Sequence, residues 1–313
     1  MPKAKDLLKL ARPTQWSKGV FVLIGPLYGF RALAPDRPHA EFLLEAFLAF
    51  VIFGLASSGS YVINDILDAD ADRNHPRKRR RPIPSGTVSV PAAKLFAALL
   101  FAAAAIPLVG LSPTARLWVC VFVGLYVLNV LAYSFWLKHL AVLDVMSLSL
   151  GFVLRVLGGC AAVAIAPTAW LLNVTFFLAM FLAFGKRLGE RRTLGGADQA
   201  AAARAVHAVY TDELLRMVVV VTGVISLVTY ADYVQTQTAN FQLSIAPGSL
   251  ILLWITILPA TYGLLRCIVL LETGRYDDPT ELAVHDRPFQ LAAVLFAAIN
   301  LALLWSMKGN AFS

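Results

Sequence analysis

The sequence predicts an all-α integral membrane protein that crosses the bilayer nine times. Of its 313 residues, 58% are apolar and only 15% are charged, whereas soluble proteins are about 45–50% apolar and about 25% charged. The mean hydropathy is +0.70, and the apolar residues gather in stretches of roughly 20, the length that crosses a bilayer as a helix. These observations argue against a soluble globular enzyme and exclude a disordered chain.

Nine apolar stretches are long enough to span a membrane. In chain order they are 17–34, 42–64, 92–111, 115–136, 142–164, 168–185, 214–233, 248–271 and 289–307. Most are separated by the turn signals Pro35 and Pro38, Pro113, Pro167, Pro247–Gly248 and Pro279. Only the short turn 164–167 separates the fifth and sixth stretches, which predicts a helical hairpin. No stretch resembles a linker, so we expect residues 1–313 to form a single polytopic membrane domain.

The basic residues predict the orientation of the chain. Its formal charge is +8, which on a soluble chain would suggest nucleic-acid binding. With the N-terminus inside, 22 of the 27 Lys and Arg residues fall on the cytoplasmic side and 4 on the outer side, with Arg155 within the fifth stretch. This distribution follows the positive-inside rule. We therefore expect a cytoplasmic N-terminus, an outer C-terminus and no nucleic-acid partner.

A cluster of acids lies at the end of the second stretch. If the helix continues there, Asn64, Asp68 and Asp72 are four residues apart on one face, and Asp65 lies on the same side. Repelling carboxylates cost stability unless cations neutralise them. Mg²⁺ binds one or two carboxylates together with water and substrate phosphates, so the cluster predicts a magnesium site. The alternative is a solvated helix end whose acids pair with nearby arginines.

Five consecutive basic residues follow the acids, from Arg77 to Arg81. Such a run serves as topogenic charge, or it binds lipid headgroups. Beside a magnesium site it would also bind phosphate oxygens, arginine through a bidentate fork and lysine as a point charge. We expect some of the five to bind substrate and the others to be topogenic.

The motif Asn64-Asp65-x-x-Asp68-x-x-x-Asp72, followed by an Arg-Pro turn, resembles the first aspartate-rich motif of the UbiA prenyltransferase superfamily. The segments Tyr133-Ser134-x-x-Leu137-Lys138 and Gly151-Phe152-x-x-Arg155 also resemble family segments. This resemblance implies nine transmembrane helices around a central cavity open to the cytoplasmic side. It also implies that Mg²⁺ on Asp65, Asp68 and Asp72 holds a diphosphate.

The chain departs from ordinary members where they carry a second aspartate-rich motif, because it has Gly185-Lys186-Arg187-Leu188-Gly189-Glu190-Arg191-Arg192 there. This basic segment resembles the decaprenyl-phosphate phosphoribosyltransferase branch. So do Arg12-Pro13-x-Gln15-Trp16-x-Lys18, Leu137-Lys138-His139-x-Ala141-Val142-Leu143-Asp144, Tyr210-Thr211 and the late segment with Glu281 and Asp286-Arg287. The branch implies transfer of 5-phosphoribose from phosphoribosyl diphosphate to a polyprenyl phosphate, with release of diphosphate. It also implies a bacterial plasma membrane and a role in making lipid-linked arabinan precursors for the cell wall.

The resemblance gives each motif a role in this reaction. The acceptor is already an anion, so the site needs positive charge to bring two polyanions together more than it needs a general base. We expect the catalytic residues to be Asp65, Asp68, Asp72, Lys186 and Arg187. The expected substrate-binding residues are Lys18, Asn64, Lys78, Arg79, Arg81, Lys138, Asp144, Arg155, Glu190 and Tyr210. The cytoplasmic loops 65–91, 186–213 and 272–288 are expected to cap the site.

Arg155 is a charged residue inside a predicted span. It lies eleven residues after Asp144, which at about 100° per residue places both on one helix face, with Arg155 roughly 16 Å deeper. Intramembrane arginines usually face a cavity or a partner. We expect Arg155 to line the cavity, and a purely structural ion pair is the alternative.

Two other functions stay open at this point. A UbiA-type prenyltransferase would move a prenyl group from a prenyl diphosphate to an aromatic or other acceptor. A transporter or lipid-binding protein without chemistry is disfavoured, because the charged groups cluster at one membrane face and form no path across it. The sequence does not distinguish a monomer from a homo-oligomer.

Overall fold

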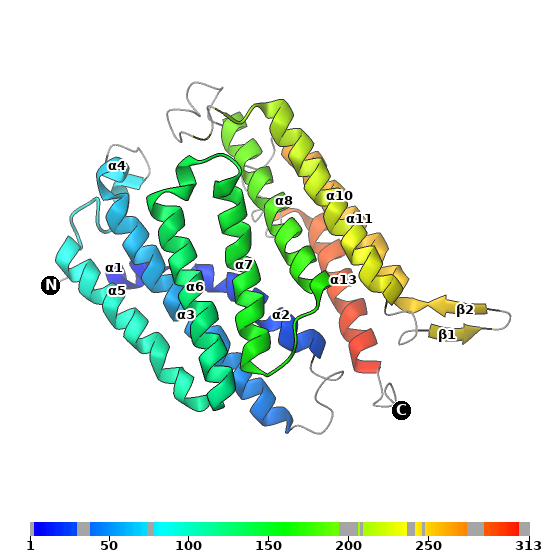
Figure 1. The fold of residues 1–313 in the computed structure, drawn as a ribbon. Helices are drawn as coiled ribbons and strands as arrows, with labels where there is room; N and C mark the ends of the chain where they lie inside the picture. The colour runs from blue at the N-terminus through cyan, green and yellow to red at the C-terminus, as the bar shows by residue number, and fades with distance from the viewer. Residues whose placement is uncertain are drawn as a thin grey trace. The chain divides into compact units, whose positions relative to one another are not determined.

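The computed structural model describes residues 3–29, 38–73, 78–193, 206, 209–236, 242–245, 248–273 and 285–306. The chain divides into two compact units, whose helices and strands are labelled in Figure 1. The first unit comprises Met1–Leu137 and Leu150–Pro167, and the second comprises Lys138–Ser149 and Thr168–Ser313. That the whole chain acts as one membrane domain stays a prediction.

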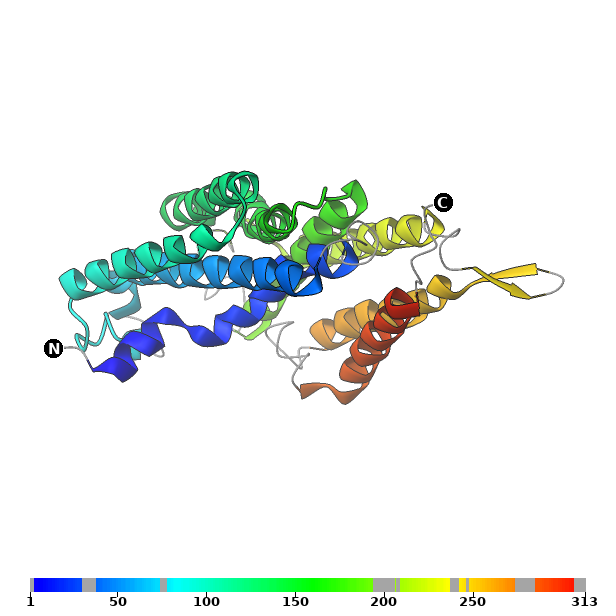
Figure 2. The same ribbon diagram turned by 90° about the horizontal axis from the view of Figure 1, so that it is seen from below.

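The first unit is built around one long helix, α3 (His39–Leu67). The other elements of this unit are α1 (Ala4–Ala11), η1 (Pro13–Gly19), α2 (Val20–Gly29), α4 (Ala69–Arg73), η2 (Lys78–Arg80), α5 (Val90–Ala105), η3 (Ile106–Gly110), α6 (Pro113–Phe135) and most of α7 (Leu143–Ala162). Helices α5 and α6 pack against α3, and the dark-blue segment from α1 to α2 follows another side of it (Figure 2). The α5 and α6 helices begin at serine N-caps, because Ser89 accepts from the Ala92 N–H and Ser112 from the Ala115 N–H.

Apolar side chains from α2, α3, α6 and α7 form the core of the first unit, with Val22, Phe53, Val119 and Leu154 buried. The α2 and α7 backbones approach closely at Gly159, where an added Cβ would overlap the carbonyl oxygen of Val22. A glycine is therefore required at this helix contact, since any larger residue would push the two helices apart.

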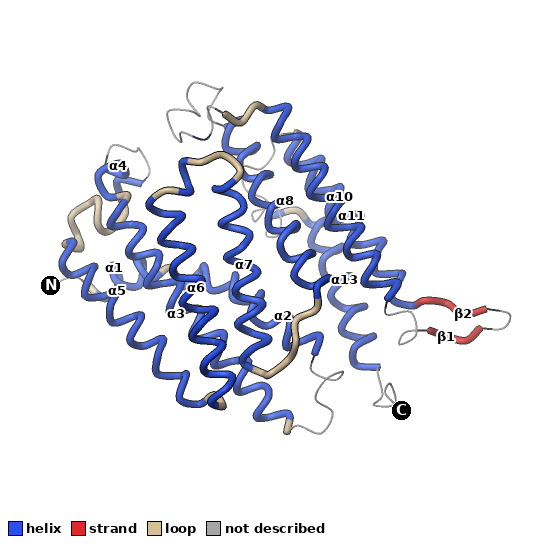
Figure 3. The backbone as a smooth tube through the Cα atoms, viewed as in Figure 1, coloured by secondary structure: helices blue, strands red, loops and turns tan. Residues whose placement is uncertain are grey.

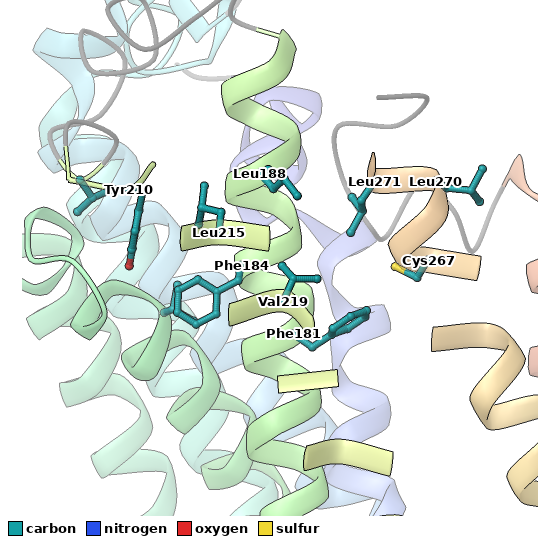
Figure 4. Packing of buried hydrophobic residues seen from close by; sticks show 11 residues of the cluster. Phe181, Phe184, Leu188, Tyr210, Leu215, Val219, Cys267, Leu270 and Leu271 are labelled. Atoms are coloured by element: carbon teal, nitrogen blue, oxygen red, sulfur yellow. The ribbon is translucent and has the colours of Figure 1, made fainter. Parts of the chain in front are cut away.

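The second unit contains the start of α7, then α8 (Ala169–Thr193), α10 (Asp212–Thr236), η7 (Leu252–Thr256), α11 (Ile257–Glu272) and α13 (Arg287–Ser306). Helix α8 packs along α10, and α11 packs against α13. Figure 4 shows the core between these helices, in which Phe181 and Phe184 of α8 lie near Val219 of α10. Cys267 and Leu271 of α11 complete this cluster.

Among the residues that the structure describes, seven helices are long and apolar enough to cross a membrane, namely His39–Leu67, Val90–Gly110, Pro113–Phe135, Leu143–Ala162, Ala169–Arg191, Asp212–Thr236 and Leu252–Glu272. They match seven of the nine predicted stretches and confirm a multi-pass helical protein. The ninth stretch corresponds to a shorter apolar helix, Arg287–Leu303. The first stretch falls on the seven-residue η1 and the ten-residue α2. Nine crossings therefore stay a prediction.

The predicted eighth stretch was placed too early, because residues 248–251 form a strand. β1 (Gln242–Ile245) and β2 (Gly248–Ile251) pair as an antiparallel hairpin with Gln242 opposite Ile251 (Figure 3). Polar and apolar residues alternate in β1, which is the period of a strand, whereas β2 has the sequence Gly-Ser-Leu-Ile. Leu250 and Ile251 continue directly into the apolar segment that follows, so the apolar average extended the predicted helix into β2.

Candidate active site

Two buried carboxylates converge at the end of α3 in the first unit. Asp65 lies on the last turns of α3, and Asp72 lies on α4. The same guanidinium nitrogen of Arg81 is 3.2 Å from Asp65 Oδ1 and 2.7 Å from Asp72 Oδ2. Because the side chains of Asp65 and Asp72 are only 3% and 5% exposed, the two acids approach each other within the protein, and a cation neutralises them there.

Two further cations reach this acidic pair. Arg12 donates to Asp65 Oδ1 at 2.5 Å, and Lys78 Nζ lies 4.0 Å from Asp72 Oδ1. Arg12 has φ 49°, a left-handed conformation that is costly for a residue other than glycine. The ion pair with Asp65 offsets this cost. It also ties the η1 segment to the end of α3.

The third predicted acid, Asp68, points to a different partner. It is the C-cap residue of α3, and its carboxylate accepts from the Asn64 amide at 3.0 Å. The Asn64 amide oxygen in turn accepts from the Ser134 hydroxyl of α6 at 2.9 Å. Asp70, the acid that the spacing leaves off this face, is exposed and pairs with Arg73. The structure thus brings Asp65 and Asp72 together and holds Asp68 beside them through Asn64.

The acidic pair suits Mg²⁺ in its chemistry. Within the described ranges, no three His, Cys, Asp or Glu side chains are grouped closely enough to hold a metal ion by themselves. Mg²⁺ prefers one or two carboxylates and fills its remaining positions with water and phosphate oxygens, so Asp65 and Asp72 supply a sufficient protein share. The pairing with arginines, which was the alternative interpretation of these acids, is present in the structure for the same two residues.

The basic run after the acids divides into two groups. Lys78 and Arg81 face the acidic pair. Arg79 and Arg80 of η2 are exposed, and neither pairs with a carboxylate in the described part of the chain. Arg77 lies outside the described residues. That some of the five bind substrate, as expected of Lys78, Arg79 and Arg81, and that the others are topogenic stays a prediction.

A second polar cluster lies at the start of α7 in the second unit, where Asp144, Arg187 and Tyr210 meet. Arg187 Nε donates to Asp144 Oδ2 at 3.0 Å, and the Tyr210 hydroxyl donates to Asp144 Oδ1 at 2.6 Å. Arg187 Nη1 also donates to Glu190 at 3.1 Å. The side chains of Asp144 and Arg187 are 0% and 2% exposed, so these two residues form a buried ion pair. Glu190 is a second carboxylate that pairs with the same arginine.

The cluster also holds strained backbone in place. Val142 has φ 69°, a genuine outlier for a β-branched residue. Its N–H donates to the Tyr210 hydroxyl at 2.6 Å. Burial raises the pKa of Tyr210 above its ordinary value, and the hydrogen bond to Asp144 adds to this. Tyr210 therefore keeps its proton at neutral pH and joins Val142 to Asp144.

Arg155 is buried in the first unit, with 6% of its surface exposed. Its guanidinium donates to the hydroxyls of Ser57 at 3.2 Å and Tyr126 at 2.8 Å, and it lies over the Tyr126 and Phe152 rings. No carboxylate pairs with it among the residues that the structure describes. The structural ion pair is therefore not seen there, and lining of a cavity by Arg155 stays a prediction.

The predicted lysines lie on three short or terminal segments. Lys18 is on η1, Lys138 is on η4 (Leu137–His139), and Lys186 is near the end of α8; all three are half-buried. The predicted loop 186–213 begins as helix, because α8 continues to Thr193. Glu281 and most of the loop 272–288 lie outside the described residues.

Sequence reasoning missed two residues that hold the site. Arg12 was noted only as part of the Arg12-Pro13 motif, and Ser134 only as part of the Tyr133-Ser134 segment. Their partners, Asp65 and Asn64, are 53 and 70 positions away along the chain. The motifs were the available signal, because spacing alone cannot reveal contacts between separate helices.

This chain is similar in sequence and in fold to several known proteins. The sequence model of the UbiA prenyltransferase family matches residues 22–292. A decaprenyl-phosphate phosphoribosyltransferase of Mycolicibacterium smegmatis is 34% identical, covering 91% of this chain and 88% of its own. The enzyme of that name from Corynebacterium glutamicum is 33% identical, over 93% of this chain and 84% of its own. A UbiA homologue of Archaeoglobus fulgidus bound to DMAPP and Mg²⁺ has a TM-score of 0.67 at 18% identity, covering 96% and 99% of the two chains.

Proposed function

The chain belongs to the UbiA prenyltransferase family, and on this premise we propose that it is a membrane phosphoribosyltransferase. It transfers 5-phosphoribose from phosphoribosyl diphosphate to a polyprenyl phosphate and releases diphosphate. Two relatives named decaprenyl-phosphate phosphoribosyltransferase, similar over about nine tenths of this chain, support this substrate pair. The product would serve as a lipid-linked sugar precursor for arabinan in the cell wall.

The observation that carries the proposal is the buried pair Asp65 and Asp72, shared by Arg81 and flanked by Arg12 and Lys78. Two carboxylates surrounded by three cations can bind a metal–diphosphate complex as a unit. The acids would hold the metal, and the cations would bind the phosphate oxygens. A site made only of acids would repel the diphosphate, and a site made only of cations would not retain the metal.

Asp65, Asp72 and the adjacent Asp68 would hold Mg²⁺, which when bound withdraws charge from the leaving diphosphate. Arg81 and Arg12 place positive charge beside the bond that breaks. The ribosyl carbon passes through an oxocarbenium-like state, as in glycosyl transfer. Asn64, fixed by Ser134, keeps Asp68 in position.

The acceptor phosphate needs no strong base, because it is already an anion. It needs cations that lower its repulsion from the donor. Lys18, Arg79, Lys138 and Lys186 are the cations proposed for the substrates, with no division between donor and acceptor. Arg187 is the proposed positioning residue, since its charge is balanced by Asp144 and Glu190 and it anchors the end of α8 that carries Lys186.

The topology proposed for this function has nine helices around a cavity that opens to the cytoplasmic side. The N-terminus lies in the cytoplasm, the C-terminus lies outside, and the membrane is the bacterial plasma membrane. Seven long apolar helices and the UbiA-like fold support a multi-pass protein. Arg155 and Tyr210 stay proposed substrate-binding residues. The oligomeric state is left open.

The test offers the purified protein two kinds of donor. With Mg²⁺ and polyprenyl phosphate, labelled phosphoribosyl diphosphate should yield a labelled lipid, and the yield should fall to background in EDTA. A family member that moves prenyl groups would instead consume prenyl diphosphate in the presence of an aromatic acceptor. Consumption of prenyl diphosphate alone would refute the proposal.

A matched pair of variants links the reaction to the acidic centre. Asp68→Ala should abolish turnover while the protein stays folded, because Asp68 lies at a helix end and its removal leaves no buried cavity. Asp70→Ala, two residues away and exposed, should keep its activity. Full activity of Asp68→Ala would refute the assignment of Asp68 to the metal site.

A further inference from the structure

A group of four exposed cations lies beside the acidic centre without belonging to it. Lys3, Lys5 and Lys9 are on or next to α1, and Arg80 is on η2. The Lys9 ammonium donates to the Arg80 carbonyl oxygen at 3.3 Å, so the two elements lie together although the residues are 71 positions apart. We call these four residues the α1–η2 basic surface.

The four side chains differ from the neighbouring cations in what they contact. Arg12, Lys78 and Arg81 pair with buried carboxylates. The four residues of the α1–η2 basic surface are exposed, and none pairs with a carboxylate in the described ranges. Even with Asp6, the acid of α1, counted, residues 3–11 carry a net charge of +2. The surface therefore presents uncompensated positive charge to its surroundings.

The α1 helix is fixed to the protein by one face and exposes an apolar side chain on another. Leu10 is fully buried against Val62 and Ala69. Leu8 is 62% exposed, and it lies within an arc of about 100° that also contains Lys5 and Lys9. An exposed leucine beside lysines is typical of a helix that lies in a membrane interface, with leucine among the acyl chains and ammonium groups among the headgroups.

We propose that the α1–η2 basic surface binds anionic phospholipid of the membrane in which the protein lies. The occupant that fits is a phosphodiester headgroup, because exposed cations on two elements in contact lie beside the exposed apolar side chain of Leu8. Binding there would hold α1 and η2 against the bilayer. Both elements flank the acidic centre, since Arg12 follows α1 and Arg81 follows η2.

The proposal is independent of the chemistry that the acidic centre performs. A juxtamembrane lysine or arginine contributes about 1 kcal/mol to binding of an anionic surface, which is about fivefold in affinity. Neutralising the four cations should therefore weaken binding of an anionic lipid by two orders of magnitude or more. Binding of a zwitterionic lipid should not change.

The test is native mass spectrometry of the full-length protein in an uncharged detergent, titrated with phosphatidylglycerol or phosphatidylcholine. The neutral variant carries Lys3→Gln, Lys5→Gln, Lys9→Gln and Arg80→Gln. The charge-conserving variant carries Lys→Arg at the three lysines and Arg80→Lys. A control variant with Arg73→Gln and Arg216→Gln removes exposed arginines that already pair with Asp70 and Glu272.

We expect the wild-type protein, the charge-conserving variant and the control variant to bind phosphatidylglycerol more tightly than phosphatidylcholine. The neutral variant should lose this preference and keep the thermal unfolding midpoint of the wild type in uncharged detergent. If the neutral variant binds phosphatidylglycerol as tightly as the wild type, the proposal is wrong. A wild-type protein without any preference for phosphatidylglycerol would overturn it as well and would leave the four charges a topogenic role alone.

Discussion

Arg81 is predicted to compete with Mg²⁺ for the acidic pair when no substrate is bound. Its guanidinium contacts both Asp65 and Asp72, so a metal ion that binds these acids must displace it or accept its repulsion. The Arg81→Gln substitution removes this competing charge. We therefore expect Arg81→Gln to destabilise the metal-free protein and to increase its affinity for Mg²⁺.

The size of the effect follows from the charges at the site. Because Mg²⁺ carries two charges, a unit charge about 5 Å from it is worth roughly 2–7 kcal/mol between the dielectric limits of water and of a protein surface. Arg81 is 29% exposed, so solvent and movement of its side chain away from the ion lower this energy to about 1–3 kcal/mol. The expected gain in Mg²⁺ affinity is therefore about fivefold to 150-fold.

The assay is a thermal unfolding titration of purified protein with MgCl₂ and no substrate. Arg80→Gln is the matched control, because it removes the same charge one residue away without touching either acid. Arg81→Gln should start with a lower midpoint and gain more from Mg²⁺ than the wild type or Arg80→Gln. Equal or smaller stabilisation of Arg81→Gln by Mg²⁺ would refute the idea that Arg81 occupies the metal site.

Three further predictions concern residues that stabilise the interior of one or the other unit. Asp144→Asn should lower the free energy of unfolding by about 3–5 kcal/mol, because it leaves the buried charge of Arg187 without its main partner. Chemical denaturation measures this loss, and a loss below about 1 kcal/mol would contradict the prediction. Tyr210→Phe should cost about 1–3 kcal/mol. Because burial raises the folded-state pKa of Tyr210 above its ordinary value of 10.0, this contribution should be constant below pH 10 and be lost only at higher pH. A difference that shrinks between pH 7 and 9 would contradict this reasoning. Gly159→Ala should lower the unfolding temperature by several degrees or prevent folding, because its Cβ would overlap the Val22 carbonyl oxygen; an unchanged melting curve would show that α2 can move away.

The sequence predicted the features that depend on local composition. Seven of the nine apolar stretches appear as long apolar helices, because length and hydropathy are properties of one continuous segment. The spacing of Asp65, Asp68 and Asp72 likewise indicated acids on one side of the helix end, of which Asp65 and Asp72 share Arg81, and it left the exposed Asp70 out.

Contacts between separate elements were beyond the reach of periodicity. Nothing in the spacing of Asp144, Arg187 and Tyr210 shows that they meet, because 43 and 66 positions separate the partners of Asp144 from it. A catalytic role for Arg187 stays a prediction, and two carboxylates pair with this residue in the structure. Strand β2 was predicted as helix because Leu250 and Ile251 continue into the apolar segment that follows.

The central claim is that the acidic centre directs cleavage between the ribosyl carbon and the diphosphate of the donor. It is tested most directly with phosphoribosyl diphosphate carrying ¹⁴C in the ribose and ³²P in the terminal diphosphate phosphorus. After incubation with the protein, Mg²⁺ and polyprenyl phosphate, the ¹⁴C should appear in the lipid and the ³²P in free diphosphate, in equal amounts. Recovery of ³²P in the lipid, or no transfer of ¹⁴C, would contradict the account.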